Sequence, residues 1–322
     1  MTVSLELAPL LPPTAGPVTG SAGVDLRPAP LSYRMAALRR AGYNTALLTG
    51  GDLFLDAVAS SAGRDLPAPA AEPDARSESL EAAVKRLFGL DHSRSLPRGL
   101  SAERVVCAAL VKPGDTVATN CRFATTRDSV EALGGQVLEL HSRTALQPDS
   151  VEPFKGDMDL KELALLAHSG RHLACIRMEA SANLLGGQPF SLANLRAVSG
   201  LAREFHLPLV LDASFLESNL AVMRAVEPGL SERSLRDLCL EIGSLCDILY
   251  FSGSRPPRGR GGAVACRSRE LLESMLGRVP KTGSPGDYDG GPPADESGAL
   301  AGLVEAVDGA GQGGRSSPAL AE

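Results

Sequence analysis

The sequence predicts an α/β fold in which a mostly parallel sheet lies between helices. From about residue 102 onward, short apolar segments alternate with amphipathic helical segments, and short turns join them. The apolar segments are also nearly continuous in hydrophobic residues, as expected for strands that carry helices on both faces. With 322 residues, of which 43% are hydrophobic, the chain is long enough to bury such a core.

The helices are predicted from apolar residues that recur with helical spacing. In segment 191–205, Leu192, Leu195 and Val198 share one face, and Ser191 occupies an N-cap position. Gly89 marks the end of the helix that begins at residue 77. The predicted helices span residues 32–41, 77–88, 102–111, 129–134, 160–168, 191–205 and 235–245.

The strands are predicted from short runs rich in Leu, Val and Ile. Segment 207–212 (LPLVLD) is the clearest of them, and the turn at residues 112–115 (KPGD) precedes the first. The predicted strands span residues 116–120, 137–140, 173–178, 207–212, 248–252 and 262–266.

Composition divides the chain into three parts. Residues 1–32 contain six prolines and no sustained period, which predicts an extended N-terminal arm. Residues 33–282 carry the strand and helix pattern and form the large domain. Residues 283–322 are rich in Gly and Pro around a short apolar stretch at 299–307, and we expect this tail to be disordered because it is too Gly-rich to pack.

Charge and cysteine content exclude several functional classes. A formal net charge of -6 argues against a general nucleic-acid binder. No stretch approaches the roughly 18 apolar residues of a membrane span, and the N-terminus lacks the basic start of a signal peptide. Six scattered cysteines without C-x-x-C spacing predict free buried thiols in a reduced, cytoplasmic protein, with no metal site.

Candidate site residues follow the predicted strands, because ligands of open α/β sheets bind at the carboxyl ends of strands. Phe123 follows the first strand, Asn183 the third, and Asp212 ends the fourth. The turn at residues 98–101 leads into a helix and presents backbone N–H groups that suit a phosphate. An aromatic ring, a carboxylate and a phosphate-type turn together resemble a pyridoxal-phosphate (PLP) pocket, although each position alone is also common in strand ends without a ligand.

The segment GGQPFSLANLRAVSGLAREFHLPLVLDAS, residues 186–214, resembles a motif of tryptophanase and tyrosine phenol-lyase, the PLP-dependent beta-eliminating lyases. The resemblance extends from about residue 33 to 307, with weaker matches at 32–56, 99–103, 119–126 and 246–254. It implies the large domain of the aminotransferase-like fold (fold type I). It also implies an amino-acid-like small-molecule ligand and a homodimer or homotetramer. The net charge and the lack of a long apolar stretch, by contrast, are the grounds for expecting neither nucleic acid nor membrane as partner.

The same resemblance implies roles for individual residues. Phe123 matches the phenylalanine that stacks on the cofactor ring, Asn183 the asparagine at its phenolic oxygen, and Asp212 the aspartate at its pyridine nitrogen. In the phosphate cup, the family's Gln-Gly-Arg reads Arg-Gly-Leu here. The cofactor-binding residues implied in this way are Arg98, Gly99, Leu100, Phe123, Asn183, Asp212 and Ser252.

The chain departs from the family at the reactive positions. The family's SxKKD motif aligns with Ser-Gly-Ser-Arg-Pro at 252–256, so Arg255 stands where the Schiff-base lysine is expected. An arginine cannot readily form a Schiff base, because its guanidinium stays protonated. Ala124 and Phe215 likewise replace an aspartate and an arginine of the family. We also expect the family's small C-terminal domain, with its substrate-binding arginine, to be missing. No catalytic residue is therefore assigned.

Three hypotheses follow from this pattern. The favoured one is a degenerate homologue, a pseudoenzyme that has lost amino-acid lyase activity and acts as a binding or accessory protein. The second is a repurposed lyase that holds PLP non-covalently and cleaves a carbon–carbon or carbon–heteroatom bond of an amino acid. The third is one subunit of a split lyase that a partner chain completes. Of the five lysines, only Lys281 is predicted near the pocket; the others are Lys85, Lys112, Lys155 and Lys161.

Overall fold

The computed structural model describes most of the predicted large domain, and all structural statements below concern these residues. The described residues are 79–96, 98–121, 123–147, 149–252, 261–277, 300, 303–304 and 307–308. The predicted N-terminal arm, the helix predicted at 32–41, Arg255 and Lys281 lie outside them.

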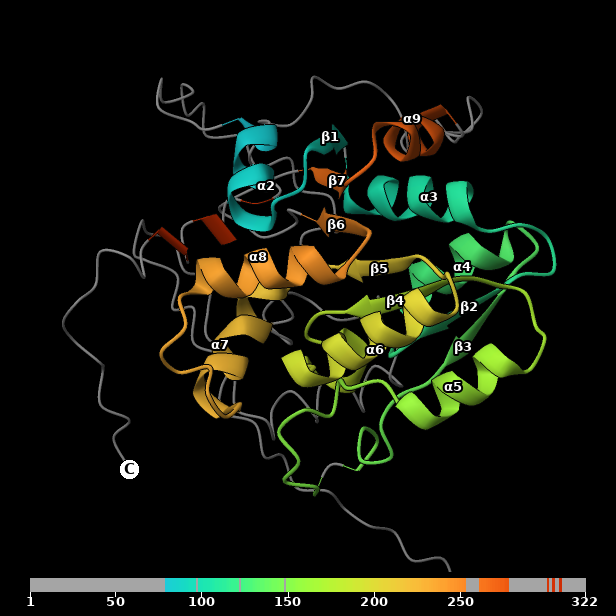
Figure 1. Ribbon diagram of the computed structural model, residues 1–322. Helices are drawn as coiled ribbons and strands as arrows, with labels where there is room; N and C mark the ends of the chain where they lie inside the picture. The colour runs from blue at the N-terminus through green and yellow to red at the C-terminus, as the bar shows by residue number, and fades with distance from the viewer. Residues whose placement is uncertain are drawn as a thin grey trace, which may run out of the picture. The chain divides into compact units, whose positions relative to one another are not determined.

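Seven strands form one sheet in the described part of the chain, in the order β1-β7-β6-β5-β4-β2-β3 (Figure 1). The pairs from β3 through β6 are parallel, whereas β7 runs antiparallel to both β6 and β1. This sheet confirms the predicted, mostly parallel α/β fold. The strands are β1 (His92–Leu96), β2 (Thr116–Thr119), β3 (Gln136–Glu139), β4 (Leu173–Glu179), β5 (Leu209–Asp212), β6 (Ile248–Ser252) and β7 (Gly262–Cys266).

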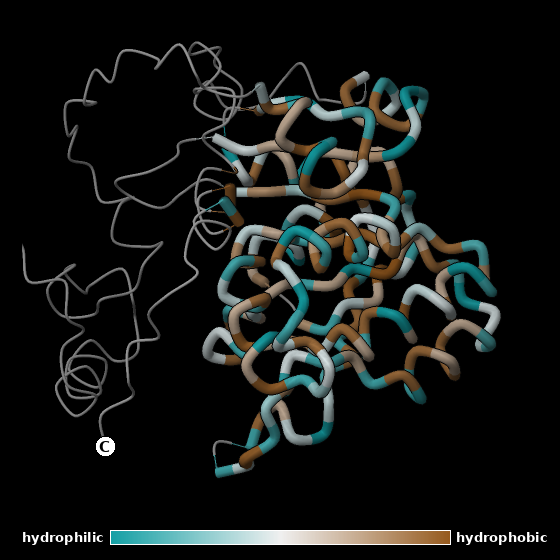
Figure 2. The backbone as a smooth tube through the Cα atoms, turned by 60° about the vertical axis from the view of Figure 1, so that its left-hand side comes forward, coloured by the Kyte–Doolittle hydropathy of each residue, from teal (hydrophilic) through white to brown (hydrophobic). Residues whose placement is uncertain are grey.

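Helices cover both faces of this sheet, which is why its strands are apolar on both sides. In β5, Leu209 and Leu211 join the core beneath α2, α6, α7 and α8, whereas Val210 joins the core beneath α3 and α9. Figure 2 colours the backbone by hydropathy and shows hydrophobic segments throughout the described part of the chain. The helices are α2 (Leu80–Phe88), α3 (Gly99–Leu110), α4 (Ala124–Glu131), α5 (Leu160–His168), η3 (Asn183–Leu185), α6 (Leu192–Glu204), α7 (Leu216–Val226), α8 (Leu235–Leu245) and α9 (Arg269–Gly277).

The predicted helix ends agree with the capping chemistry. The Ser191 hydroxyl accepts a hydrogen bond from the backbone N–H of Asn194 at 3.0 Å, so it is the N-cap of α6. Gly89 adopts a φ of 64° and closes α2 in the left-handed conformation that favours glycine. All six cysteines are buried free thiols, as predicted. Burial raises the pKa of Cys175 and Cys239 to about 12, which makes these thiols poor nucleophiles.

Four elements were not predicted from the sequence: β1, α7, α9 and the short helix η3. Strand β1 has the polar sequence HSRSL, because it is an edge strand that pairs only with β7. Helix α7 places Asn219 on its buried face, between Leu216 and Met223, and this polar residue interrupts the apolar pattern. Helix α9 buries only two side chains, Leu272 and Met275. Helix α4 begins at residue 124 rather than 129, since its first turn contains threonines instead of apolar residues.

Part of the predicted tail packs on the domain. Leu300, Leu303 and Val307 are buried and contact the core that α2 and α8 share. Asp308 also forms an ion pair with Arg86 of α2 at 3.0 Å. The expectation that residues 283–322 do not pack is therefore wrong for this apolar stretch. No helix in the described part of the chain is long and apolar enough to cross a membrane.

Two carboxylates hold the first turn of α6. Asp157 accepts hydrogen bonds from the Ser191 backbone N–H at 2.6 Å and from the Ser191 hydroxyl at 3.1 Å. Glu227 accepts from the backbone N–H groups of Leu192 and Ala193 at 2.7 and 2.9 Å. Burial, assisted by the negative charge of Glu227, raises the pKa of Asp157 to about 6 from its ordinary value of 3.8.

This pKa predicts a pH dependence of stability. The folded protein holds the Asp157 proton more tightly than the unfolded chain does, so the associated stability is full below about pH 4 and is lost as the pH rises past about 6. Asp157→Asn removes this loss while keeping an oxygen that accepts from Ser191. We expect the variant to gain roughly 3 kcal/mol relative to the wild type between pH 4 and 7, measured by urea unfolding. If the difference in the free energy of unfolding between the two proteins stayed the same from pH 4 to 7, the raised pKa of Asp157 would be contradicted.

Candidate functional site

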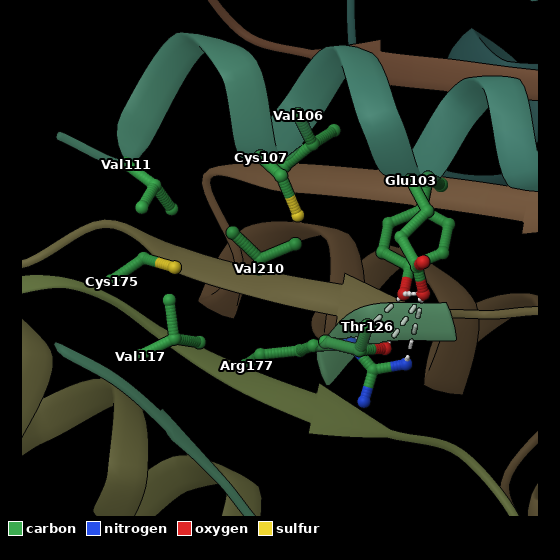
Figure 3. A pocket seen from close by; sticks show the side chains of 10 residues that line it. Glu103, Val106, Cys107, Val111, Val117, Thr126, Cys175, Arg177 and Val210 are labelled. Carbon is green, nitrogen blue, oxygen red and sulfur yellow. Dashed lines mark hydrogen bonds and ion pairs between the residues drawn. The ribbon is translucent and has the colours of Figure 1, made fainter. Parts of the chain in front are cut away.

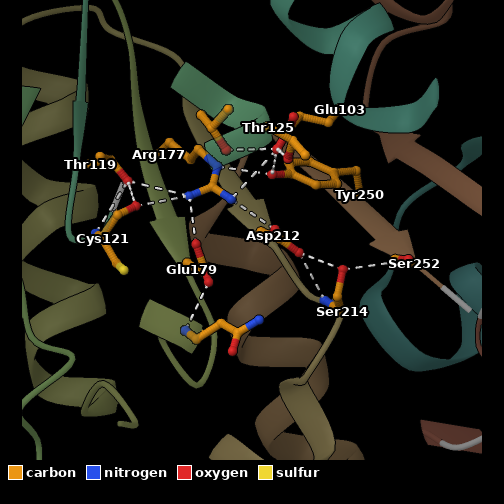
Figure 4. A network of polar contacts seen from close by, with 12 residues as sticks. Glu103, Thr119, Cys121, Thr125, Arg177, Glu179, Asp212, Ser214, Tyr250 and Ser252 are labelled. Carbon is orange, nitrogen blue, oxygen red and sulfur yellow. Dashed lines mark hydrogen bonds and ion pairs between the residues drawn. The ribbon is translucent and has the colours of Figure 1, made fainter. Parts of the chain in front are cut away.

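The carboxyl ends of the central parallel strands meet at one edge of the sheet, where Asp212 and Ser252 lie (Figure 4). Asp212 is the last residue of β5, and Ser252 is the last residue of β6. Asn183 is the first residue of η3, directly after β4, and Phe123 precedes α4 after β2. Strand alternation and parallel pairing thus bring together residues that are far apart in the sequence.

A buried guanidinium, that of Arg177 on β4, forms the centre of this edge. Only 4% of its side chain is exposed. Its Nη2 lies 2.8 Å from Asp212 Oδ2, its Nη1 lies 3.0 Å from Glu179 Oε2, and its Nε donates to the Tyr250 hydroxyl at 2.9 Å. Glu103 of α3 lies farther away, with its Oε2 at 4.0 Å from Nη2. Despite burial, the neighbouring tyrosine and carboxylates hold the pKa of Arg177 well above its ordinary value, so the guanidinium stays charged.

Strand β2 also contributes to the surroundings of this guanidinium. Arg177 Nη1 lies 3.4 Å from the Thr119 hydroxyl and 3.3 Å from the Cys121 carbonyl oxygen. Because Thr119 pairs with Arg177 in the sheet register, the two side chains lie on the same face. The network around Arg177 therefore spans four neighbouring strands: β2, β4, β5 and β6.

Glu103 connects this network to the helices above the sheet. Its Oε2 accepts from the hydroxyls of Thr126 at 2.7 Å and Thr125 at 3.3 Å, and its Oε1 accepts from Ser129 at 3.3 Å. These three donors belong to α4. Glu103 thereby fixes α4 against α3, and Phe123 lies at the start of the helix that it fixes.

The segment that carries Asn183 is fixed by the same network. The Asn183 backbone N–H donates to Glu179 Oε1 at 3.0 Å, while the other Glu179 oxygen accepts from Arg177. Burial raises the pKa of Glu179. Ser181 adopts a φ of 51°, and its backbone N–H donates to Asn219 Oδ1 at 3.0 Å. A non-glycine residue in this conformation is strained, and strain of this kind is typical of functional segments.

Asp212 is held on both of its oxygens. Oδ2 accepts from Arg177, and Oδ1 accepts from the Ser214 hydroxyl at 2.6 Å and the Ser214 backbone N–H at 3.1 Å. The same hydroxyl accepts from the Ser252 backbone N–H at 3.1 Å. Asp212 and Ser252, both predicted site residues, are thus joined through Ser214, and only 14% of the Asp212 side chain is exposed.

The predicted phosphate turn lies against the end of β6. A Cβ atom added to Gly99 would lie 2.2 Å from the Ser252 side chain, so only glycine allows α3 to approach this closely. Gly262 of β7 is equally close to the carbonyl oxygen of Arg98, at 2.3 Å from an added Cβ. The start of α3 at Gly99 therefore lies against Ser252, the last residue of β6.

A small cavity lies beneath the network, between α3 and the sheet (Figure 3). Its volume is about 10 Å³, which is room for about one water molecule. Its lining is apolar apart from the network residues at one end. The lining residues are Glu103, Val106, Cys107, Val111, Val117, Thr126, Cys175, Arg177, Val210 and Tyr250. A cavity of this size cannot contain a cofactor ring.

Most residues of the network were not predicted from the sequence as site residues, among them Arg177, Glu103 and Tyr250. One signal for Arg177 was present, since Arg177 and Glu179 are charged residues two positions apart in an otherwise apolar strand. That spacing places both on one face of β4. No comparable sequence pattern pointed to Glu103 or Tyr250. Both contact Arg177, which lies 74 residues from Glu103 and 73 residues from Tyr250 in the chain.

Sequence comparison identifies the relatives of this chain. The family model for beta-eliminating lyases matches residues 68–284. The chain belongs to this family. A tyrosine phenol-lyase from Nostoc punctiforme is 31% identical over 253 residues, which cover 74% of this chain and 54% of that protein. A tryptophanase from Rhodobacter capsulatus is 30% identical over 282 residues, which cover 84% of this chain and 62% of that protein.

The chain therefore spans 54% and 62% of the lengths of these two relatives. Among solved structures, a methionine gamma lyase from Micromonospora echinospora matches with a TM-score of 0.43 and 18% identity, covering 62% of this chain and 46% of that one. The family assignment and the observed sheet confirm the predicted aminotransferase-like α/β fold and the resemblance to tryptophanase and tyrosine phenol-lyase.

Beta-eliminating lyases depend on PLP, so the described residues can be tested for their fit to this cofactor. The resemblance implies that Asp212 faces the ring nitrogen, which requires a carboxylate available to a second cation. Here the Arg177 guanidinium already lies 2.8 Å from that carboxylate, and Ser214 donates twice to its other oxygen. Asn183 and Ser252 lie at the expected edge, but the surroundings of Asp212 do not fit a cofactor nitrogen.

The contact between Gly99 and Ser252 gives a direct test of the packing at this edge. Gly99→Ala places a methyl group 2.2 Å from Ser252, so we expect a loss of about 1–3 kcal/mol in the free energy of unfolding. The matched control is Gly200→Ala in α6, where an added Cβ meets nothing within 4 Å. That variant should gain roughly 0.5–1 kcal/mol from helix propensity. Equal effects of the two substitutions in urea unfolding would show that α3 does not approach β6 this closely.

Proposed function

We propose that this chain retains the fold of the beta-eliminating lyases without their amino-acid lyase activity, and acts as a binding or accessory protein. The observation that carries the proposal is Arg255, which stands at the position of the Schiff-base lysine. A guanidinium that stays protonated cannot supply the nucleophilic amine on which lyase chemistry of this family depends.

The described lysines do not replace that amine. Lys85 of α2 forms an ion pair with Asp91 at 3.0 Å. Lys155 donates to the Gln147 carbonyl oxygen at 2.7 Å, in a loop before α5. Lys112 follows the end of α3, and Lys161 lies in the first turn of α5. None of these four belongs to the network around Arg177.

The alternative function is a lyase that holds PLP without a covalent bond. Asn183 and Asp212 favour this alternative, because both lie at the same edge of the sheet, as the family's cofactor contacts would. The ion pair between Asp212 and Arg177 argues against this alternative. An amino-acid-like ligand, a homodimer or homotetramer and a cytoplasmic location complete the proposal, and they rest on family analogy.

Cofactor labelling tests the proposal. PLP is added to the full chain, the mixture is reduced with borohydride, and labelled lysines are located by mass spectrometry. We expect no saturable labelling of a single lysine, no aldimine band near roughly 410–430 nm and no cleavage of tyrosine or tryptophan. Stoichiometric labelling of one lysine together with turnover would refute the loss of lyase activity. Saturable PLP retention on gel filtration without labelling would favour the non-covalent alternative.

The variant Arg255→Lys is the matched probe in the same assay. It restores the amine at the family's position and changes no other residue. Labelling at residue 255 in the variant, with none in the wild type, would assign the loss of chemistry to Arg255 itself. Labelling of the same lysine in both proteins would show that Arg255 is not the cause, and would contradict the proposal.

A further inference from the structure

The ion pair between Arg177 and Asp212 has a consequence for what this edge of the sheet can bind. A carboxylate offers about four lone-pair positions. Arg177 and the two donors of Ser214 take up three of them. The guanidinium also carries a permanent positive charge. It therefore occupies the position in which the carboxylate of Asp212 would attract a cationic ligand atom most strongly.

We propose that Arg177 is an internal counter-ion that takes up Asp212 permanently, which makes Asp212 a structural residue and closes this edge to a PLP-type ring nitrogen. The inference rests on the proposed function in one respect: it takes the lyase chemistry as lost. It goes further, because it states that even non-covalent binding of PLP through Asp212 is lost, and it gives the reason.

The guanidinium is held in place by partners other than Asp212. Its Nε donates to Tyr250, and its Nη1 contacts Glu179, Thr119 and the Cys121 carbonyl oxygen. Turning Arg177 away from Asp212 would break several of these contacts in a site where its side chain is 4% exposed. A ligand would therefore have to compensate for buried hydrogen bonds as well as compete for one carboxylate.

Electrostatics act in the same direction. A carboxylate stabilises a protonated pyridine nitrogen less when another cation already neutralises that carboxylate. Arg177 lies 2.8 Å from Asp212, closer than to either of the other two carboxylates of the network. Its charge therefore lowers the affinity of Asp212 for a second cation. This edge of the sheet therefore has an aspartate at the family's position, but that aspartate is not available to a ligand.

The test compares the thermal unfolding of the full-length wild type and Asp212→Asn, each with and without about 1 mM PLP. If Asp212 is structural, the substitution removes one partner of a buried pair and should lower Tm by roughly 5–10 °C without PLP. PLP should shift the Tm of the wild type by less than about 1 °C. A ligand with a Kd near 10 μM would instead raise it by several degrees.

The matched control is Asp128→Asn, which breaks an Asp–Arg pair of the same residue types at the surface. Arg127 Nη2 lies 3.3 Å from Asp128, whose side chain is 68% exposed. We expect a Tm change of less than about 2 °C for this variant, because exposed pairs contribute little.

Two results would overturn the inference. One is an Asp212→Asn variant as stable as the wild type, since aspartates reserved for ligands are not needed for folding. The other is a PLP-dependent rise in the Tm of the wild type that Asp212→Asn abolishes. If Asp212→Asn does not fold, the binding of PLP to the wild-type protein is measured by equilibrium dialysis instead. A Kd below about 100 μM would then contradict the inference. Neither result depends on lysine labelling, so the inference and the proposed function can fail separately.

Discussion

The carboxyl end of the sheet depends on one buried guanidinium. Burying an arginine costs several kcal/mol unless charges and hydrogen bonds compensate it, and Arg177 has both. Asp212 and Glu179 lie within 3.0 Å of it, and the Tyr250 hydroxyl accepts a hydrogen bond from its Nε. Because these partners belong to β4, β5 and β6, the strand ends cannot separate without exposing an unsatisfied charge. The positions of Ser252 and Asn183 follow from this constraint.

The same constraint gives the family resemblance a different meaning. The chain belongs to the beta-eliminating lyase family, and Asp212 ends strand β5. Asp212, however, is paired with Arg177 from within the chain, and the arginine at position 255 carries no amine. Asp212 has its counter-ion within the chain, which gives a structural reason for keeping this carboxylate. This accounts for Asp212 without requiring the chemistry of the relatives.

Sequence patterns predicted the parts of this arrangement that are local. The alternation of strands and helices placed Asp212 and Ser252 at strand ends, and capping rules gave the start of α6 at Ser191. The network itself could not be predicted, because it depends on which side chains from distant strands face one another. Arg177 and Glu179 stand two positions apart in an otherwise apolar strand, but nothing in the sequence links them to Glu103, the single acidic residue of α3. Only the sheet order brings them together.

The central claim, that Arg177 and Asp212 act as one structural unit, is tested most directly by a double-mutant cycle. The free energies of unfolding of the wild type, Arg177→Met, Asp212→Asn and the double variant are measured in urea. Coupled residues in one buried network should give an interaction energy of roughly 2 kcal/mol or more. Additivity within about 0.5 kcal/mol would show that the two residues stabilise the fold independently, and would contradict the account.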